Sequence, residues 1–203
     1  VVRVAAPLGQ GDDSGAATDA ASAASAAAAA AAGGLFDASQ YITNSRTQDV
    51  GFISLALGAA TEALAASGVL GAAGFNPHRA GVALGAGVGS LSEVTSASAT
   101  LAGPRGLRRL TPFFVPRTLV NLAAGHVSMT FNLQGPNHCV ATACATGAHA
   151  VGDAYRFVRN GDADVMLAGG TESTIDALSV AGFSRALAQR LGPGKPEIGR
   201  AHV

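Results

Sequence analysis

The chain has no tryptophan, and aromatic residues make up only 5% of its 203 positions. A core of this composition favours close packing of helices on a sheet over packing built on large side chains. Charged residues are also scarce, at 13%, and the 13 basic side chains balance the 13 acidic ones. Because no net field of either sign results, we expect no nucleic-acid partner and no attraction to an anionic membrane.

Cysteines and long apolar runs are equally scarce. Cys139 and Cys144 are the only two cysteines, which is too few, at too short a spacing, for a disulfide framework. The sequence therefore indicates a reducing compartment. No apolar run reaches the roughly 20 residues that a membrane span needs. We expect neither a membrane span nor a bound metal.

Residues 1–34 differ in composition from the rest of the chain. From residue 9 onward this segment is rich in alanine, glycine and serine and has no large apolar residue, which is typical of a disordered or frayed helical lead-in. A targeting peptide is the alternative. Against it, Arg3 is the only basic residue of the segment, and Asp12, Asp13 and Asp19 oppose an import signal.

Apolar periodicity predicts the first regular elements. Apolar residues recur at spacings of three and four from Asp49 to about Ser67, which predicts a helix, and Gly68 follows where a C-cap belongs. The run "AGVALGAG" at 80–87 is short, apolar and bounded by glycines. This pattern predicts a buried strand.

Two more helices are expected in the middle of the chain. One should start near Ser90 or Ser92, with Glu93 in its first turn. The other follows Pro116 in the run "RTLVNLAAGHVSMTF", where proline at the start of a helix loses no hydrogen bond. Between them, "GPRGLRRLTP" predicts a basic loop.

The sequence pattern from residue 138 to residue 170 predicts a βαβ unit of a parallel sheet. Residues 138–142 suit a short strand, residues 145–159 a helix ending at Asn160-Gly161, and residues 163–170 a second buried strand. Cys144 falls where the first strand gives way to the helix.

Two interpretations of Cys144 follow from this position. Ligands of open α/β sheets bind outside the carboxyl ends of the strands, and a helix N-terminus favours the thiolate form of a nearby cysteine. The backbone N–H groups at such a terminus also stabilise the oxyanion that forms when a thiolate attacks a thioester. The alternative is a buried, inert thiol, which is the commonest state of a free cysteine. Cys139, inside the expected strand, is interpreted as inert.

None of the nearby histidines is an obvious base for Cys144. His149 follows five residues later, so on a helix it points about 140° away. His126 and His138 could approach only through tertiary folding, and a base must come within hydrogen-bond distance.

Several runs of sequence carry a family resemblance that extends from about Gly34 to Ala186. They are "GVALGAGVGSL", "TPFFVPRTLVNLAAGHVS", "LQGPNHCVATACATGAHAVGDAYRFVRNGDADVMLAGGTES" and "AGFSRA". In this order they resemble the N-terminal half of β-ketoacyl-[acyl-carrier-protein] synthases, the condensing enzymes of type II fatty-acid synthesis. The resemblance implies a thiolase-like α/β fold, of which the chain holds the N-terminal βαβ half with an incomplete, mostly buried mixed sheet. "PFFVPRTLVNLAAGHVS" followed by "GPNH" is more similar to the mitochondrial enzyme, which implies a mitochondrial location, with the bacterial cytoplasm as the alternative.

The resemblance also implies roles for individual residues. Cys144 would be the nucleophile that takes the growing acyl chain as a thioester. Malonyl-carrier protein is then decarboxylated, and its carbanion attacks that thioester to extend the chain by two carbons. The residues that match the family's acyl tunnel are Phe114, Ala143, Phe183 and Val88, although both phenylalanines could equally be core aromatics.

The implied partner is acyl carrier protein, whose phosphopantetheine carries the substrates, so no cofactor of the chain's own is expected. The family's docking pair matches Arg108 and Arg109. With Arg105 and Arg117 they form a cationic patch suited to an acidic partner, and a solvated loop is the alternative. The complete enzyme is expected to be a homodimer.

The resemblance stops at Ala186, so the expected divisions are a lead-in at 1–34, a synthase N-terminal domain at 35–186 and an unrelated tail at 187–203. The family's C-terminal half, with its two decarboxylation histidines, a lysine and a "GFGG" loop, is not found. We therefore expect a truncated 3-oxoacyl-[acyl-carrier-protein] synthase. The alternatives are a non-catalytic acyl-binding or dimer-partner fragment, and a polyketide ketosynthase domain, which would usually carry serines after the cysteine.

Overall fold

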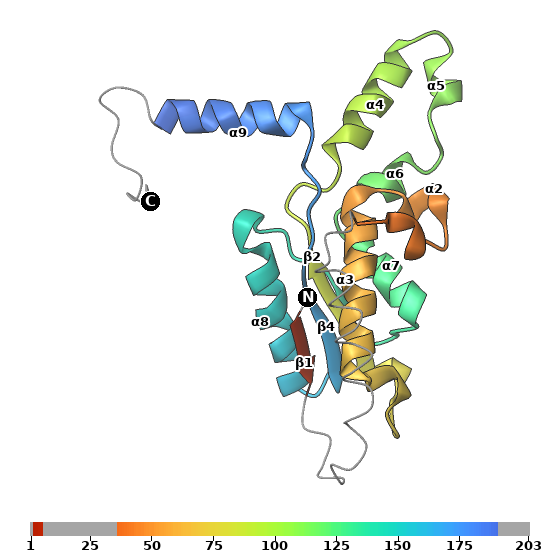
Figure 1. Ribbon diagram of the computed structural model, residues 1–203, viewed down its shortest axis with the longest axis vertical. Helices are drawn as coiled ribbons and strands as arrows, with labels where there is room; N and C mark the ends of the chain where they lie inside the picture. The colour runs from red at the N-terminus through yellow and green to blue at the C-terminus, as the bar shows by residue number, and fades with distance from the viewer. Residues whose placement is uncertain (1, 6–35, 191–203) are drawn as a thin grey trace.

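The computed structural model describes residues 2–5 and 36–190, in which a four-stranded sheet lies between helices on its two faces (Figure 1). The strand order is β1-β4-β2-β3. β2 runs parallel to both of its neighbours, whereas β1 is antiparallel to β4. This confirms the mixed sheet that the family resemblance implies. The strands are β1 (Val2–Ala5), β2 (Ala80–Gly85), β3 (Asn137–His138) and β4 (Val165–Gly170).

Three helices cover the sheet. α3 (Gly51–Ser67) and α7 (Leu122–Phe131) lie on one face, and α8 (Thr146–Arg159) lies on the other (Figure 1). Of the described helices, none is both long and apolar enough to cross a membrane. The remaining elements are α2 (Ser45–Gln48), α4 (Leu91–Ala102), α5 (Gly106–Arg109), α6 (Phe114–Thr118), α9 (Ala177–Arg190) and the short turns η1 (Ala38–Gln40), η2 (Val69–Gly71), η3 (Pro77–Arg79) and η4 (Ala143–Ala145).

The two faces of the sheet bury side chains of different size. Between the sheet, α3 and α7 the core contains larger residues, among them Phe52, Leu57 and Leu84. On the α8 side the buried cluster of described residues consists of four alanines and Met166, which is the one large side chain among them. Small side chains allow α8 to lie close to the strands, as the alanine-rich composition predicts.

Glycines bring the start of α8 against the carboxyl ends of β2 and β4. A side chain at Gly85, the last residue of β2, would collide with the Val140 carbonyl and the Thr146 methyl group. At the end of β4, a Cβ on Gly170 would lie only 3.0 Å from the Cα of Gly147. The close approach therefore requires residues without a side chain at both strand ends.

Several predicted helix boundaries are confirmed. α3 ends at Ser67, and Gly68 adopts a left-handed conformation with φ of 61° while its N–H donates to the Ala65 carbonyl. Ser90 caps α4, because its Oγ accepts a hydrogen bond from the N–H of Glu93. Local side-chain chemistry was sufficient to place these ends.

The beginning of the chain differs from the expected lead-in. Val2–Ala5 form the edge strand β1, which pairs antiparallel with residues 165–168 of β4. A strand of four residues is stabilised by this distant partner, so the composition of its own surroundings could not predict it. The remainder of the lead-in, residues 6–34, lies outside the described residues, as does most of the expected tail at 187–203.

Two predicted elements are shorter than expected. The strand expected at 138–142 ends at His138, and the chain then turns, with the Thr142 N–H donating to Thr146 Oγ1 at 2.8 Å. The helix expected after Pro116 is divided into α6, which includes this proline, and α7. The break follows Thr118, whose hydroxyl bonds back to the carbonyls of the preceding turn and competes with helix propagation.

Candidate functional site

Cys144 lies exposed in the single turn η4, directly before α8. The turn is closed by two hydrogen bonds, from the Ala145 N–H to the Thr142 carbonyl and from the Thr142 N–H to Thr146 Oγ1. Ala143 has a φ of 51°, a left-handed conformation that costs free energy for a residue with a side chain. The exposure of Cys144 removes the main premise of the inert alternative, which requires a buried thiol.

The surroundings of the two cysteines are different. α8 is 14 residues long and has no side-chain cap at its start, and Cys144 lies one residue before its N-cap, Ala145. Cys139 is half-buried, and burial raises the pKa of its thiol. The Cys139 position therefore favours the neutral thiol.

A cavity of about 460 Å³ opens beside Cys144. Its walls come from the ends of β2 and β4, from η4 and from the start of α8, which is the edge where open α/β sheets bind ligands. Of the residues that match the acyl tunnel, the structure brings Val88, Ala143 and Phe183 together with Cys144 in this cavity. Phe114, half-buried in α6, is not among the described residues that line it.

The cavity also contains a carboxylate that sequence reasoning missed. Glu172 Oε2 accepts hydrogen bonds from the N–H groups of Gly87 at 3.1 Å and Val88 at 2.8 Å, and Oε1 accepts one from the Ser173 N–H. Its main partners are 84 and 85 residues away along the chain. No local pattern could have indicated this contact.

The three candidate histidines lie apart from the cavity. His149 lines a different groove, of about 340 Å³, and its Nδ1 lies 2.8 Å from Thr142 Oγ1. His138 pairs with Asp153 at 3.2 Å. His126 is buried in α7, where no described residue pairs with its ring nitrogens and burial lowers its pKa. None of the three is among the described residues that line the Cys144 cavity.

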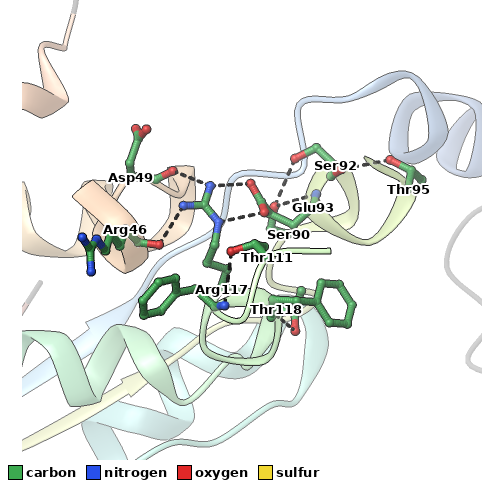
Figure 2. A network of polar contacts seen from close by, with 11 residues as sticks. Arg46, Asp49, Ser90, Ser92, Glu93, Thr95, Thr111, Arg117 and Thr118 are labelled. Carbon is green, nitrogen blue, oxygen red and sulfur yellow. Dashed lines mark hydrogen bonds and ion pairs between the residues drawn. The ribbon is translucent and has the colours of Figure 1, made fainter. Parts of the chain in front are cut away.

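The predicted cationic patch is smaller than the sequence suggests. Arg108 and Arg109 are exposed on α5, and Arg105 is exposed just before it. Arg117 does not belong with them, because Glu93 neutralises it inside the fold (Figure 2). This correction could not come from spacing, since 24 residues separate the two partners.

Arg117 instead joins three elements. Its Nε and Nη2 donate to the Glu93 carboxylate at 2.8 and 2.6 Å, and its other contacts reach the carbonyls of Arg46 and Asp49 at 3.1 Å (Figure 2). The hydrogen bond to Arg117 lowers the pKa of Glu93. Arg117 thus holds α2 and α4 to α6.

The layered mixed sheet and the cysteine at the edge of its parallel strands define a thiolase-like α/β domain. The chain belongs to the β-ketoacyl synthase family, whose N-terminal domain matches residues 12–195. This match extends beyond the expected 35–186 at both ends.

Two curated relatives give the degree of similarity. The mitochondrial 3-oxoacyl-[acyl-carrier-protein] synthase of Arabidopsis thaliana is 51% identical over 155 residues, which are 76% of this chain and 33% of that protein. The 3-oxoacyl-[acyl-carrier-protein] synthase 2 of Rhizobium meliloti (strain 1021) is 47% identical over 152 residues, with coverages of 74% and 36%. The chain therefore spans about a third of the length of these relatives.

Solved structures agree on the fold. A β-ketoacyl synthase from Burkholderia phymatum STM815 is similar with a TM-score of 0.62 and 28% identity, over 77% of this chain and 38% of that one. A type II PKS ketosynthase in complex with its acyl-carrier protein gives a TM-score of 0.69 at 23% identity, over 77% and 45%. The ketosynthase fold expected from the sequence is confirmed.

Proposed function

We propose that this chain is the N-terminal part of a 3-oxoacyl-[acyl-carrier-protein] synthase of fatty-acid elongation, with Cys144 as the acyl acceptor. The observation that carries the proposal is the exposed Cys144 thiol at the start of α8, beside a cavity at the carboxyl ends of β2 and β4. The names of the curated relatives support the same activity.

The chemistry assigned to Cys144 is transthioesterification. Its thiolate attacks the carbonyl carbon of an acyl thioester, and the new C–S bond creates an oxyanion that the N-terminus of α8 stabilises. Collapse of this intermediate breaks the bond to the phosphopantetheine sulfur. That sulfur leaves and takes up the proton that Cys144 lost, so atoms and charge balance.

The acyl chain would occupy the cavity beside Val88, Ala143 and Phe183. Decarboxylation of malonyl-carrier protein and attack of its carbanion would complete the two-carbon extension. By the family resemblance, the histidines for those steps belong to the C-terminal half of the enzyme. We therefore assign acyl transfer to the described residues and condensation to the full-length protein.

The proposed partner is an acyl carrier protein, and its phosphopantetheine supplies the only prosthetic group in the scheme. The exposed Arg108 and Arg109 on α5 suit an acidic partner. We further propose a homodimer for the full-length enzyme, from the resemblance, and a mitochondrial location, which the name of the Arabidopsis relative supports.

Mass spectrometry tests the proposal. The chain is incubated with a carrier protein charged with a medium-length acyl group, and the modified peptide is mapped. We expect one acyl adduct, on Cys144, that persists in Cys139→Ala and disappears in Cys144→Ala. Circular dichroism of each variant reports folding, and a folded wild-type chain that takes no acyl group would contradict the proposed function.

A further inference from the structure

The segment that follows β4 is anchored at several points to more distant parts of the fold. The Thr171 N–H donates to the Gly85 carbonyl at 3.0 Å, and the Thr171 hydroxyl donates to the Phe52 carbonyl in α3 at 2.7 Å. Glu172 comes next and is bound to the N–H groups of Gly87 and Val88. The hydrogen bonds of Thr171 thus hold the backbone next to Glu172 in place, and from there the Glu172 carboxylate binds Gly87 and Val88.

Gly87 lies between this carboxylate and the turn that carries the nucleophile. A Cβ on Gly87 would lie 3.2 Å from Glu172 Oε2 and 3.8 Å from the Cα of Ala143. Ala143 has the left-handed backbone that precedes Cys144, and such a conformation persists only where its surroundings hold it. The Gly87–Val88 segment is part of those surroundings.

A carboxylate suits this position because it only accepts hydrogen bonds. One oxygen takes two backbone N–H groups in charge-assisted bonds, which are stronger than bonds between neutral groups. The remaining oxygen is occupied by the Ser173 N–H. The orientation of Glu172 is therefore fixed from both sides.

Building on the proposed acyl transfer to Cys144, we propose that Glu172 is a positioning residue for this reaction. It holds Gly87 and Val88 against Ala143, which keeps the Cys144 turn and the apolar wall at Val88 in the arrangement that the acyl thioester requires. Glu172 acts through these residues and exchanges no proton with the substrate.

Two substitutions separate this role from simple loss of structure. Glu172→Ala removes both acceptor oxygens, whereas Glu172→Gln keeps one oxygen for the Gly87 and Val88 N–H groups. We expect the alanine variant to lower the limiting rate of acyl transfer about tenfold, as loss of a charge-assisted pair would. The half-saturating concentration of acyl-carrier protein should stay unchanged, because the proposed docking residues Arg108 and Arg109 lie on α5. The glutamine variant should recover to within about threefold of wild type.

Controls report on the thiol and on the fold. Alkylation of Cys144 by iodoacetamide, which needs an accessible thiolate but no positioned acyl thioester, should change by less than about twofold in the alanine variant. Glu62→Ala removes an exposed carboxylate of α3 and should leave every rate unchanged. A wild-type acyl-transfer rate in Glu172→Ala, an equal loss in alanine and glutamine variants, or a parallel fall in alkylation would each overturn the proposal.

Amide hydrogen exchange distinguishes failure of the positioning role of Glu172 from failure of the proposed function. The N–H groups of Gly87 and Val88 should exchange about tenfold faster in Glu172→Ala than in wild type. If the wild-type chain takes no acyl group, the proposed function fails. Unchanged exchange at Gly87 and Val88 in Glu172→Ala would then still overturn the proposal that Glu172 holds this segment, and faster exchange would support it.

Discussion

At the scale of single residues, the surroundings of Cys139 and Cys144 decide which of the two thiols is available for chemistry. They are five positions apart, yet Cys139 is half-buried with its pKa raised by burial, whereas Cys144 is exposed at the start of α8. Of the two thiols, only that of Cys144 is both open to solvent and next to a helix N-terminus. This difference provides an internal reference for any reagent that reacts with thiols.

His126 is a second residue whose environment controls its ionisation. It lies within α7 and is only 5% exposed, and neither ring nitrogen has a partner among the described residues. Burial lowers its pKa below the ordinary value. The folded protein therefore resists protonating His126, whereas the unfolded chain takes up the proton near pH 6.5.

We predict that His126 makes the fold less stable as the pH falls below about 6.5. The unfolded state then binds more protons than the folded state, so the free energy of unfolding decreases by up to about 1.4 kcal/mol per pH unit until the folded-state pKa is reached. His126→Leu should show a smaller decrease between pH 7.5 and 5.5 in urea unfolding. Equal slopes for the two proteins would contradict this assignment.

At the scale of elements, Arg117 joins helices that the sheet does not organise. α2, α4 and α6 meet at its guanidinium group through the Glu93 carboxylate and two backbone carbonyls (Figure 2). The side chains of Arg117 and Glu93 are only 16% and 26% exposed. The planar guanidinium group of arginine can donate to all of these acceptors at once. The compact ammonium group of lysine lacks that geometry.

We predict that Arg117→Lys lowers the free energy of unfolding by about 1 kcal/mol at pH 7, although the charge is kept. The pKa of Glu93 is lowered by its hydrogen bond to Arg117, so this contribution is present above the ordinary glutamate pKa and disappears as the pH falls below about 4.3. Urea unfolding at pH 7 and pH 4 measures both effects. Arg79→Lys, in the exposed Arg79–Asp164 pair, is the matched control and should leave stability nearly unchanged. An equal loss of unfolding free energy in both variants would show that the guanidinium geometry of Arg117 has no special role.

At the scale of the whole molecule, large apolar side chains are exposed on and beside α9, which extends away from the layered sheet (Figure 1). Those exposed by more than half are Ile175, Leu178, Val180, Phe183 and Leu187. Apolar surface of this kind is uncommon on monomeric proteins and favours association. Phe183 links this surface to the Cys144 cavity.

We predict that the chain binds a hydrophobic dye and self-associates through α9. The double substitution Leu178→Glu and Val180→Glu should reduce dye fluorescence and the apparent mass in sedimentation, because two charges resist burial. Unfolding free energy should change by less than about 0.5 kcal/mol, as expected for exposed positions. Met129→Glu, at an exposed methionine of α7, serves as the control. An α9 variant that still binds dye and associates like wild type would locate the association elsewhere.

Local sequence patterns were sufficient to predict the helices and strands that surround the Cys144 cavity. Periodicity and capping predicted α3 and the start of α4, and short apolar runs between glycines predicted β2 and β4. The position of Cys144 between a strand and a helix followed from the same patterns. Its exposure did not, because burial depends on neighbours that are remote in the chain.

The sequence by itself determined the family, through its motifs, and with the family the α/β fold that it implies. Short-range patterns of residue types also placed the cysteine at the start of a helix. Only the tertiary structure decided which side chains share the cavity, that Arg117 is neutralised by Glu93, and that Glu172 binds the segment after β2. The pairing of β1 with β4 joins chain positions more than 150 residues apart. Such contacts depend on the folded path of the backbone, and short-range patterns of residue types contain no information about it.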